Sequence, residues 1–224
     1  VVGMILYLKP SYQMTSILIG GFLLIITGIV DGIKSISARY KLVAQMLAAS
    51  VVVFYGGIYF NDITILGLTL NFGVLASQII SVVFIVAIIN AINLIDGLDG
   101  LCSGISSIYF ITITIISVML GQSNGLDITL SLIMLGSTLG FLVHNFPPAS
   151  IFLGDTGSMF IGYMISVIAL LGFKMATFTS LVVPLVMLAI PIFDTLSAII
   201  RRKLKGESIA KADKEHFHHQ LLKM

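Results

Sequence analysis

The densest group of polar residues follows a long apolar segment, in the stretch Asn90–Gly100. Asn93, Asp96 and Asp99 recur at every third position. If the turn stays helical, the three side chains share one face. Two carboxylates and an amide suit a divalent cation, a general base or a nucleotide. Helix capping is the alternative, but such a run beside an apolar segment favours a functional site.

A second polar group lies between two apolar segments, in the stretch Asn145–Ser158. Pro147 and Pro148 predict the end of one helix, and the turn at Gly154–Gly157 predicts the start of the next. Asp155 can present its carboxylate to Mg²⁺, while backbone N–H groups nearby can face a phosphate. Capping of the second helix by Asp155 is an alternative of about equal weight.

A third group is the histidine cluster of the basic C-terminal tail, residues 201–224. Its imidazoles, on His216, His218 and His219, can bind phosphate, transfer protons or bind Zn²⁺. Mg²⁺ prefers oxygen ligands, so we do not assign it to these histidines. The alternative is a basic tail attracted to anionic lipid headgroups. His144, alone near a helix end, is expected to be structural.

Two further carboxylates lie at or inside apolar segments. Asp31 precedes Gly32 at the end of one such segment, where it can cap the helix or bind a ligand. Asp194 lies inside the last apolar segment and can pair with Arg201 or Arg202, or line a site. We favour the site-lining role for Asp194.

The composition indicates which elements must position these groups. Of the 224 residues, 58% are hydrophobic and only 10% are charged, with a formal net charge of +2. Soluble domains carry roughly 25% charged residues. This composition excludes a soluble enzyme, a disordered protein and a nucleic-acid-binding protein. The single cysteine, Cys102, excludes an intrachain disulfide and a thiolate metal cage.

The fold class predicted from the apolar segments is an all-α polytopic membrane protein. A bilayer core of about 30 Å needs about 20 apolar residues per helix. About seven transmembrane helices are expected after a partial one at Val1–Leu8, in the segments Gln13–Val30, Lys41–Phe60, Val74–Leu94, Ser103–Leu120, Ile128–Phe146, Ser158–Leu171 and Phe178–Ile200. The stretch Asn61–Asn71 predicts a short β-hairpin on the outer membrane surface. We expect a single domain, 1–224, truncated at both ends.

The basic residues divide the loops into two sets. One set comprises Asp31–Tyr40, Ile95–Cys102, Pro147–Gly157 and Arg201–Met224. With Lys41 at a helix end, this set carries ten of the twelve Lys and Arg residues, and the other set carries Lys9 and Lys174. The positive-inside rule places the first set in the cytoplasm. The histidines and most of the carboxylates converge on that face, whereas a transporter would place ionisable groups near the midplane.

Four motifs in this order cover essentially all of the chain: NAINLIDGLDGL (Asn90–Leu101), NFPPASIFLGDTGS (Asn145–Ser158), PIFDT (Pro191–Thr195) and DKEHFHHQLL (Asp213–Leu222). They resemble the polyprenyl-phosphate N-acetylhexosamine-1-phosphate transferases, glycosyltransferase family 4. The resemblance implies an enzyme that uses Mg²⁺, with Mn²⁺ as the alternative. Such an enzyme transfers N-acetylhexosamine 1-phosphate from a UDP-sugar to undecaprenyl phosphate and releases UMP. The HFHHQLL pattern resembles the N-acetylglucosamine branch, so UDP-N-acetylglucosamine is the expected donor.

The resemblance also implies roles for individual residues. Asp155 matches the magnesium-binding Asp, and Asn145 matches an Asn of the nucleotide pocket. The acidic motif of the catalytic pocket matches Asn93, Asp96 and Asp99, and the cytoplasmic histidine motif near the donor matches His216, His218 and His219. We therefore expect catalytic roles for Asp31, Asp96, Asp99, His216, His218 and His219. We expect substrate binding by Asn93, Asn145 and Asp194.

One position departs from the family pattern, because Gly32 stands where the family has the second of two adjacent aspartates. That pair is associated with metal or lipid-phosphate activation. The alternatives are therefore a catalytically impaired relative that binds UDP-sugar or lipid phosphate, and a membrane transporter. Direct attack by the lipid phosphate, with Asp31 as base, and a covalent phospho-enzyme are both open mechanisms. The expected setting is the plasma membrane, with the active site facing the cytoplasm, and the assembly considered is a homodimer.

Overall fold

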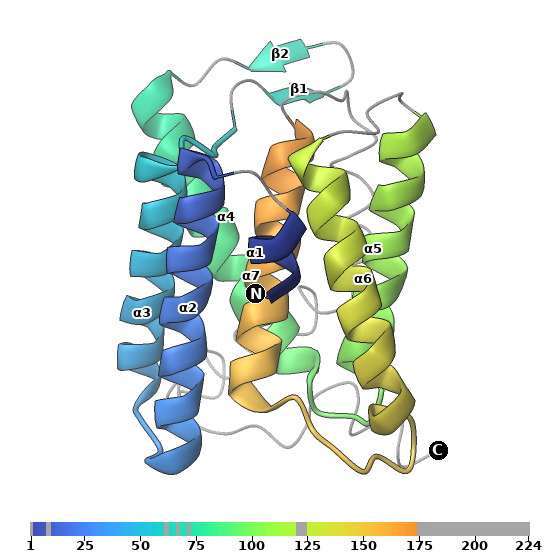
Figure 1. Cartoon of the computed structure of the whole chain (residues 1–224). Coiled ribbons are helices and arrows are strands. Elements are labelled where there is room, and N and C mark those ends of the chain that lie inside the picture. The colour runs from blue at the N-terminus through green and yellow to red at the C-terminus, as the bar shows by residue number, and fades with distance from the viewer. Residues whose placement is uncertain are drawn as a thin grey trace.

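The computed structural model describes residues 2–7, 10–60, 63–65, 68–70, 73–119 and 125–173. This part of the chain is a bundle of long helices with a small hairpin at one end (Figure 1). The predicted helix Phe178–Ile200, Asp194 and the histidine cluster of the tail lie outside the described residues.

The described helices follow the apolar segments of the sequence. Their bounds are α1 Val2–Tyr7, α2 Tyr12–Ile33, α3 Ala38–Ser50, the π-helical turn η1 Val51–Tyr55, α4 Val74–Ile95, α5 Leu101–Met119, α6 Leu126–Asn145 and α7 Gly154–Phe173. Among the described residues, five helices are long and apolar enough to cross a membrane, namely α2, α4, α5, α6 and α7. These five confirm five of the predicted spans. The predicted span Lys41–Phe60 is occupied by α3 and η1, which are not among the five.

A two-stranded hairpin lies between η1 and α4. Strands β1, Ile63–Ile65, and β2, Leu68–Leu70, pair antiparallel within the stretch for which a hairpin was predicted. Figure 1 shows this hairpin at the upper end of the bundle, opposite the loops α2–α3, α4–α5 and α6–α7. Its position on the outer membrane surface stays a prediction.

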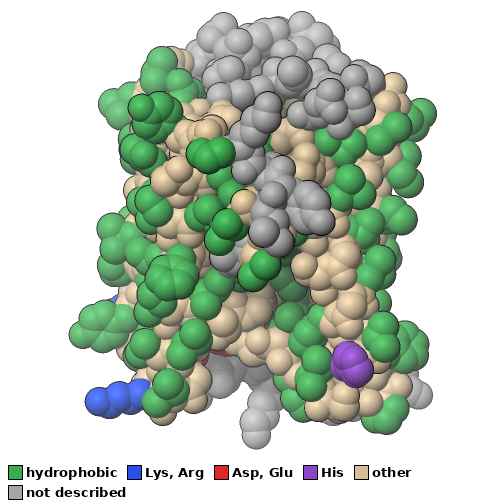
Figure 2. All heavy atoms as spheres, in the orientation of Figure 1, with side chains coloured by type: hydrophobic (Ala, Val, Ile, Leu, Met, Phe, Trp, Pro, Cys, Tyr) green, Lys and Arg blue, Asp and Glu red, His purple; other side chains and the backbone are tan. Residues whose placement is uncertain are grey.

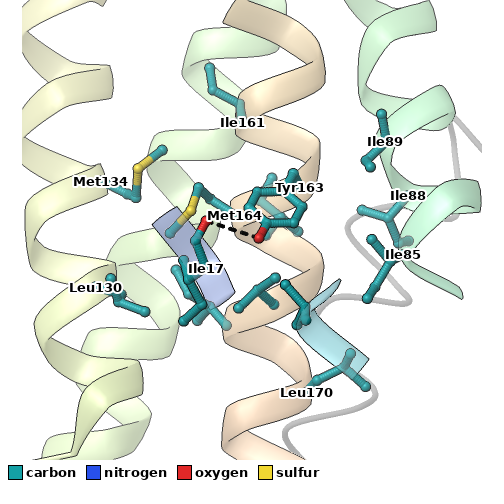
Figure 3. Packing of buried hydrophobic residues seen from close by; sticks show 14 of the residues in the cluster. Ile17, Ile85, Ile88, Ile89, Leu130, Met134, Ile161, Tyr163, Met164 and Leu170 are labelled. Carbon is teal, nitrogen blue, oxygen red and sulfur yellow. Dashed lines mark hydrogen bonds between the residues drawn. The ribbon is translucent and has the colours of Figure 1, made fainter. Parts of the chain in front are cut away.

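Helix α7 is the central helix of the described bundle. About 67% of its apolar window is buried, against 33–44% for the other four candidate spans. The hydroxyl of Tyr163 donates a hydrogen bond to the Ile17 carbonyl of α2 at 3.0 Å (Figure 3). In the same view, apolar side chains of α4 and α6 flank α7 on either side, among them Ile85, Ile88, Leu130 and Met134. The position of α7 therefore places its N-terminal turn among the other helices.

The C-terminal end of α2 approaches α7 closely at a glycine. A Cβ atom on Gly28 would lie 2.4 Å from the Cα of Thr156, so only a glycine permits this spacing. Small residues at helix interfaces let membrane helices approach in this way. Asp31 lies three residues beyond Gly28, and Asp155 directly precedes Thr156. The contact between the two backbones therefore brings these carboxylates to the same place.

The sides of the bundle are apolar. Figure 2 shows hydrophobic side chains over the visible sides, with Lys and Arg side chains at the lower end. The exposed residues include large apolar side chains from several helices, such as Phe22, Ile29, Val83, Ile111 and Leu132. An exposed apolar surface of this extent faces lipid in a membrane protein. The chain is a multi-pass membrane protein.

Candidate functional site

The ammonium of Lys41 joins two carboxylates from different helices. Lys41 Nζ lies 2.7 Å from Asp31 Oδ2 and 2.5 Å from Asp155 Oδ2. Lys41 is in the first turn of α3, Asp31 in the last turn of α2 and Asp155 in the first turn of α7. The side chains are 23%, 14% and 32% exposed, so the group remains open to a ligand from the end of the bundle.

Asp155 is also held by α4. Asn93 Nδ2 donates to Asp155 Oδ1 at 3.2 Å and to Ser158 Oγ at 2.8 Å. Ser158 in turn donates to the Gly154 carbonyl at 2.8 Å. The side-chain bonds of Asp155 therefore run to α3 and α4 rather than to the backbone of its own helix, which disfavours capping as its only role. A carboxylate at a helix N-terminus is also stabilised by the helix dipole.

Asp31 also closes the loop that follows α2. Its Oδ1 accepts a hydrogen bond from the Ile36 backbone N–H at 2.9 Å, while its Oδ2 faces Lys41. Asp31 therefore binds the backbone of the α2–α3 loop and takes part in the charged group, while ligand binding by Asp31 stays a prediction.

Asp96 lies just outside α4 and faces the same group. Helix α4 ends at Ile95, and Asp96 is its C-cap, with φ −76° and ψ 40°. Burial of Asp96, together with the negative charge of Asp155, raises the pKa of the Asp96 carboxyl to about 7. A carboxyl with a pKa near neutrality suits proton transfer.

Asp99 and Asn145 form hydrogen bonds that connect the α4–α5 loop to the α6–α7 loop. Asp99 Oδ2 accepts a hydrogen bond from the Ala149 N–H at 3.0 Å. Asn145 Oδ1 accepts from the Gly100 N–H at 3.1 Å and from Ser103 Oγ at 2.8 Å, and its Nδ2 donates to the Ile151 carbonyl at 2.9 Å. The α4–α5 and α6–α7 loops therefore form one platform beside the charged group.

The three polar residues at the end of α4 do not share one helical face. Asn93 is helical, Asp96 caps the helix, and Asp99 lies in the turn beyond it. The helix ends before Asp96, so Asp99 reaches the opposite loop while Asn93 and Asp96 stay near Asp155. The prediction of one shared face required the chain to stay helical through Asp99, and it does not.

Two contributors to the site were not assigned there from the sequence. Lys41 was counted only as a basic residue at a helix end, and Ser158 only as the start of a span. The sequence signal that could have placed Lys41 in the site is the short stretch between Asp31 and Lys41. A tight loop there returns the chain to the same end of the bundle, so Lys41 begins the next helix close to Asp31. The expected site residues Asp194, His216, His218 and His219 lie outside the described residues.

The donor set around Asp155 fits Mg²⁺. The described residues contain no group of three or more His, Cys, Asp or Glu side chains that could by itself hold a metal ion. Mg²⁺ does not need such a cage, because it keeps several waters and is bound through one or two carboxylates plus substrate phosphates. Asp31 and Asp155, both within hydrogen-bond distance of the Lys41 ammonium, are hard oxygen ligands already grouped around a cation.

An apolar groove lies on another face of the same helices. It has a volume of about 840 Å³ and is lined by side chains of α1, α2 and α3, including Ile5, Phe22, Ile26, Tyr40 and Leu47. Its lining contains no carboxylate and no amine. The groove is therefore distinct in chemistry from the group around Asp155 and does not form the candidate site.

Comparison with known proteins shows the family of the chain. The sequence model of glycosyl transferase family 4 matches residues 14–173, which include Asp31, Lys41, Asn93 and Asp155. The chain is 45% identical over 212 residues to a probable undecaprenyl-phosphate N-acetylglucosaminyl 1-phosphate transferase of Bacillus subtilis (strain 168), covering 94% of this chain and 58% of that protein.

More distant relatives are similar over comparable lengths. A decaprenyl-phosphate N-acetylglucosaminephosphotransferase of Mycolicibacterium smegmatis is 33% identical over 235 residues, covering 96% of this chain and 58% of that protein. A phospho-N-acetylmuramoyl-pentapeptide-transferase of Bacillus subtilis is 37% identical over 197 residues, covering 84% of this chain and 57% of that protein. The chain thus spans a little under three fifths of the length of these relatives.

Proposed function

Because the chain belongs to glycosyl transferase family 4, we propose that it transfers N-acetylglucosamine 1-phosphate, or a related N-acetylhexosamine 1-phosphate, from a UDP-sugar to undecaprenyl phosphate and releases UMP. The product would begin the synthesis of a cell-wall or surface polysaccharide. The main support for this proposal is that Lys41 forms ion pairs with both Asp31 and Asp155 at one end of an apolar bundle. Phosphoryl transfer depends mainly on positioning and on neutralising charge, and this group supplies both.

In this proposal Asp155, with Asp31 beside it, would hold Mg²⁺, with Mn²⁺ as the alternative. The ion would neutralise phosphate charge and orient the leaving group. Asn93 keeps the Asp155 carboxylate in place through its 3.2 Å hydrogen bond, and Lys41 adds a fixed positive charge for the phosphates. These contacts come from α3, α4 and α7, so the site is assembled by the bundle rather than by one loop.

The carboxylates divide the remaining roles. Asp96, with its pKa of about 7, suits acceptance of a proton near neutral pH. Asp31 accepts from Lys41 and from a backbone N–H, which favours a role in holding Lys41 and the cation over a free base. Asp99 and Asn145 support the loop platform on which a nucleotide would rest.

The proposed site faces the cytoplasm. Lys34, Arg39 and Lys41 lie at the same end as the carboxylates, and the positive-inside rule assigns such an end to the cytoplasm. Tyr12 and Tyr55 form an edge-to-face pair at the other end, with ring centroids 5.9 Å apart. Paired, exposed tyrosines of this kind are typical of a membrane–water interface. Tyr12 and Asp31 are about 28 Å apart along α2 at 1.5 Å per residue, which is close to the thickness of a bilayer core.

A second candidate function is binding of UDP-sugar or lipid phosphate without turnover. The observation that favours it is Gly32, which leaves Asp31 without an adjacent carboxylate. The two functions share a site and differ only in whether UMP is released.

The decisive assay measures UMP release from UDP-N-acetylglucosamine by the protein purified in detergent, with and without undecaprenyl phosphate and Mg²⁺. The transferase proposal expects release that requires both. Asp155→Asn is expected to reduce the rate by about 100-fold or more. The matched control is Asp127→Asn, because Asp127 is a carboxylate in the first turn of α6, at the opposite end of that helix from Asn145.

The other outcomes separate the alternatives. Full activity in Asp155→Asn would remove the metal role from this residue. UDP-sugar binding with no UMP release in the presence of lipid and Mg²⁺ would support the binding function. Flux of a UDP-sugar across liposomes would support a transporter.

A further inference from the structure

Two carboxamides, those of Gln45 and Asn90, bind each other and join α3 to α4. Asn90 Nδ2 donates to Gln45 Oε1 at 2.6 Å, and Gln45 Nε2 donates to Asn90 Oδ1 at 3.3 Å. Gln45 Nε2 also lies 3.7 Å from the sulfur of Met159 on α7, and Asn90 Nδ2 donates to the Val86 carbonyl at 2.8 Å. Gln45 is only 2% exposed, whereas Asn90 is exposed, so the pair joins a buried amide to one at the surface of the bundle.

The amide pair lies one helical turn away from Lys41 and Asn93, on the same two helices. Lys41 precedes Gln45 by four residues on α3, and Asn93 follows Asn90 by three residues on α4. Residues at these spacings lie on one face of a helix, about 5 Å apart along its axis. Lys41 and Asn93 both bind Asp155, each through a different oxygen of its carboxylate. The pair therefore connects the two helices that must present these partners together.

We propose that Gln45 and Asn90 are a positioning pair that fixes the register of α3 against α4, so that Lys41 and Asn93 reach Asp155 at the same time. This inference rests on the proposed function, because it treats Asp155 as the centre of the reaction. The two amides touch neither substrate nor metal in this role and act through Lys41 and Asn93.

The physical reason lies in the setting of the pair. The Gln45 amide is buried, so no water replaces a lost hydrogen-bond partner there, and without Asn90 this amide favours a shifted arrangement of the helices. A shift of about 1 Å next to reacting groups can lower a rate by about 100-fold. Hydrogen bonds are directional, and the one from Asn93 to Asp155 is already 3.2 Å long, so a small change in register breaks it.

A reciprocal exchange of side chains tests the proposal by kinetics. Gln45→Asn shortens one amide by a methylene, Asn90→Gln lengthens the other, and the double variant restores the combined reach. We expect each single variant to lower kcat by about tenfold, with KM for UDP-N-acetylglucosamine within about twofold, and the double variant to recover most of the loss.

The matched control is Ser117→Ala. Ser117 and Asp127 form a buried side-chain hydrogen bond between two helices, 2.9 Å long, which involves no residue of the candidate site. Its loss is expected to lower thermal stability without lowering kcat at temperatures well below unfolding. Single exchanges at Gln45 and Asn90 that lower stability but leave kcat unchanged would overturn the positioning role, and so would a double variant no better than either single one.

A second measurement does not depend on activity. Lys41→Met is expected to change the apparent melting temperature in the wild-type background and to have a clearly smaller effect in the Gln45→Asn background. Its effect in the Ser117→Ala background should match that in wild type. Additive effects of Lys41→Met and Gln45→Asn would contradict the proposal. If the wild type releases no UMP, the proposed function fails. The comparison of Lys41→Met in the wild-type and Gln45→Asn backgrounds, a double-mutant cycle on melting temperature, still decides whether the amide pair is coupled to Lys41.

Discussion

The ammonium of Lys41 lies 2.5 Å from a carboxylate oxygen of Asp155, although 114 residues separate the two in the sequence. The same ammonium is 2.7 Å from Asp31, so one side chain joins α2, α3 and α7. None of the three side chains is fully buried. A partly exposed ion pair contributes little to stability by itself, which favours a role in binding charged ligands.

Replacing Lys41 by methionine is expected to lower the rate of UMP release by about 100-fold or more, because the phosphates lose a fixed positive charge. The control is Arg39→Met, since Arg39 is an exposed basic residue in the same first turn of α3. We expect the control to retain most of its activity. Equal losses in the two variants would indicate a general effect of surface charge instead of a role for Lys41 in the site.

Gly28→Ala is expected to force α2 away from α7, because the new Cβ would lie 2.4 Å from the Thr156 Cα. We expect a lower melting temperature in detergent and a loss of UMP release, since Asp31 and Asp155 would separate. Gly32→Ala is the matched control, because nothing lies within 4 Å of a Cβ at Gly32. A Gly28→Ala protein with unchanged stability and activity would show that the close approach of the helices is not required.

Gly32→Asp is expected to fold normally and to bind Mg²⁺ or Mn²⁺ more tightly than the wild type. The position is exposed and has open space around it, and a second carboxylate would lie directly beside Asp31. Metal affinity can be measured from the loss of the Mn²⁺ EPR signal on binding, with Gly32→Asn as the uncharged control. If the Asp variant binds Mn²⁺ no more tightly than the Asn variant, the added carboxylate does not reach the metal.

The raised pKa of Asp96 predicts how stability depends on pH. Between its ordinary value of 3.8 and about 7, the folded protein keeps a proton that the unfolded chain has lost. The free energy of unfolding therefore falls as the pH rises through this window and levels off above it. We expect the melting temperature, measured with EDTA present, to fall from pH 5 to pH 8 in the wild type, and to fall less in Asp96→Asn. Parallel curves for the two proteins would contradict the assignment of this proton to Asp96.

Much of the helical architecture follows from local sequence. The spans α2, α4, α5 and α6 were predicted close to their observed bounds, because a long apolar run with polar ends has few alternatives in a bilayer. The start of α7 was less certain, since Gly154 to Gly157 can form a turn or a first helical turn. The hydrogen bond from Ser158 Oγ to the Gly154 carbonyl is consistent with helix from Gly154 onward.

The common side of Asp31, Asp96 and Asp155 was also predictable. Spans that cross a membrane alternate in direction, so every second loop returns to the same face. The contacts within that face were not predictable in this way. Whether Asp99 would lie beside Asp96 depended on where α4 ended, and the exact end of a helix is poorly specified by local sequence.

The sequence by itself determined a helical membrane protein with its carboxylates gathered at one face, because hydropathy and charge act along the chain. Only the tertiary structure decided that Lys41 would lie between Asp31 and Asp155 and that Gln45 would pair with Asn90. These pairings depend on the distance and register between helices. That geometry is set by close contacts such as Gly28 against Thr156, which no local pattern of residues specifies.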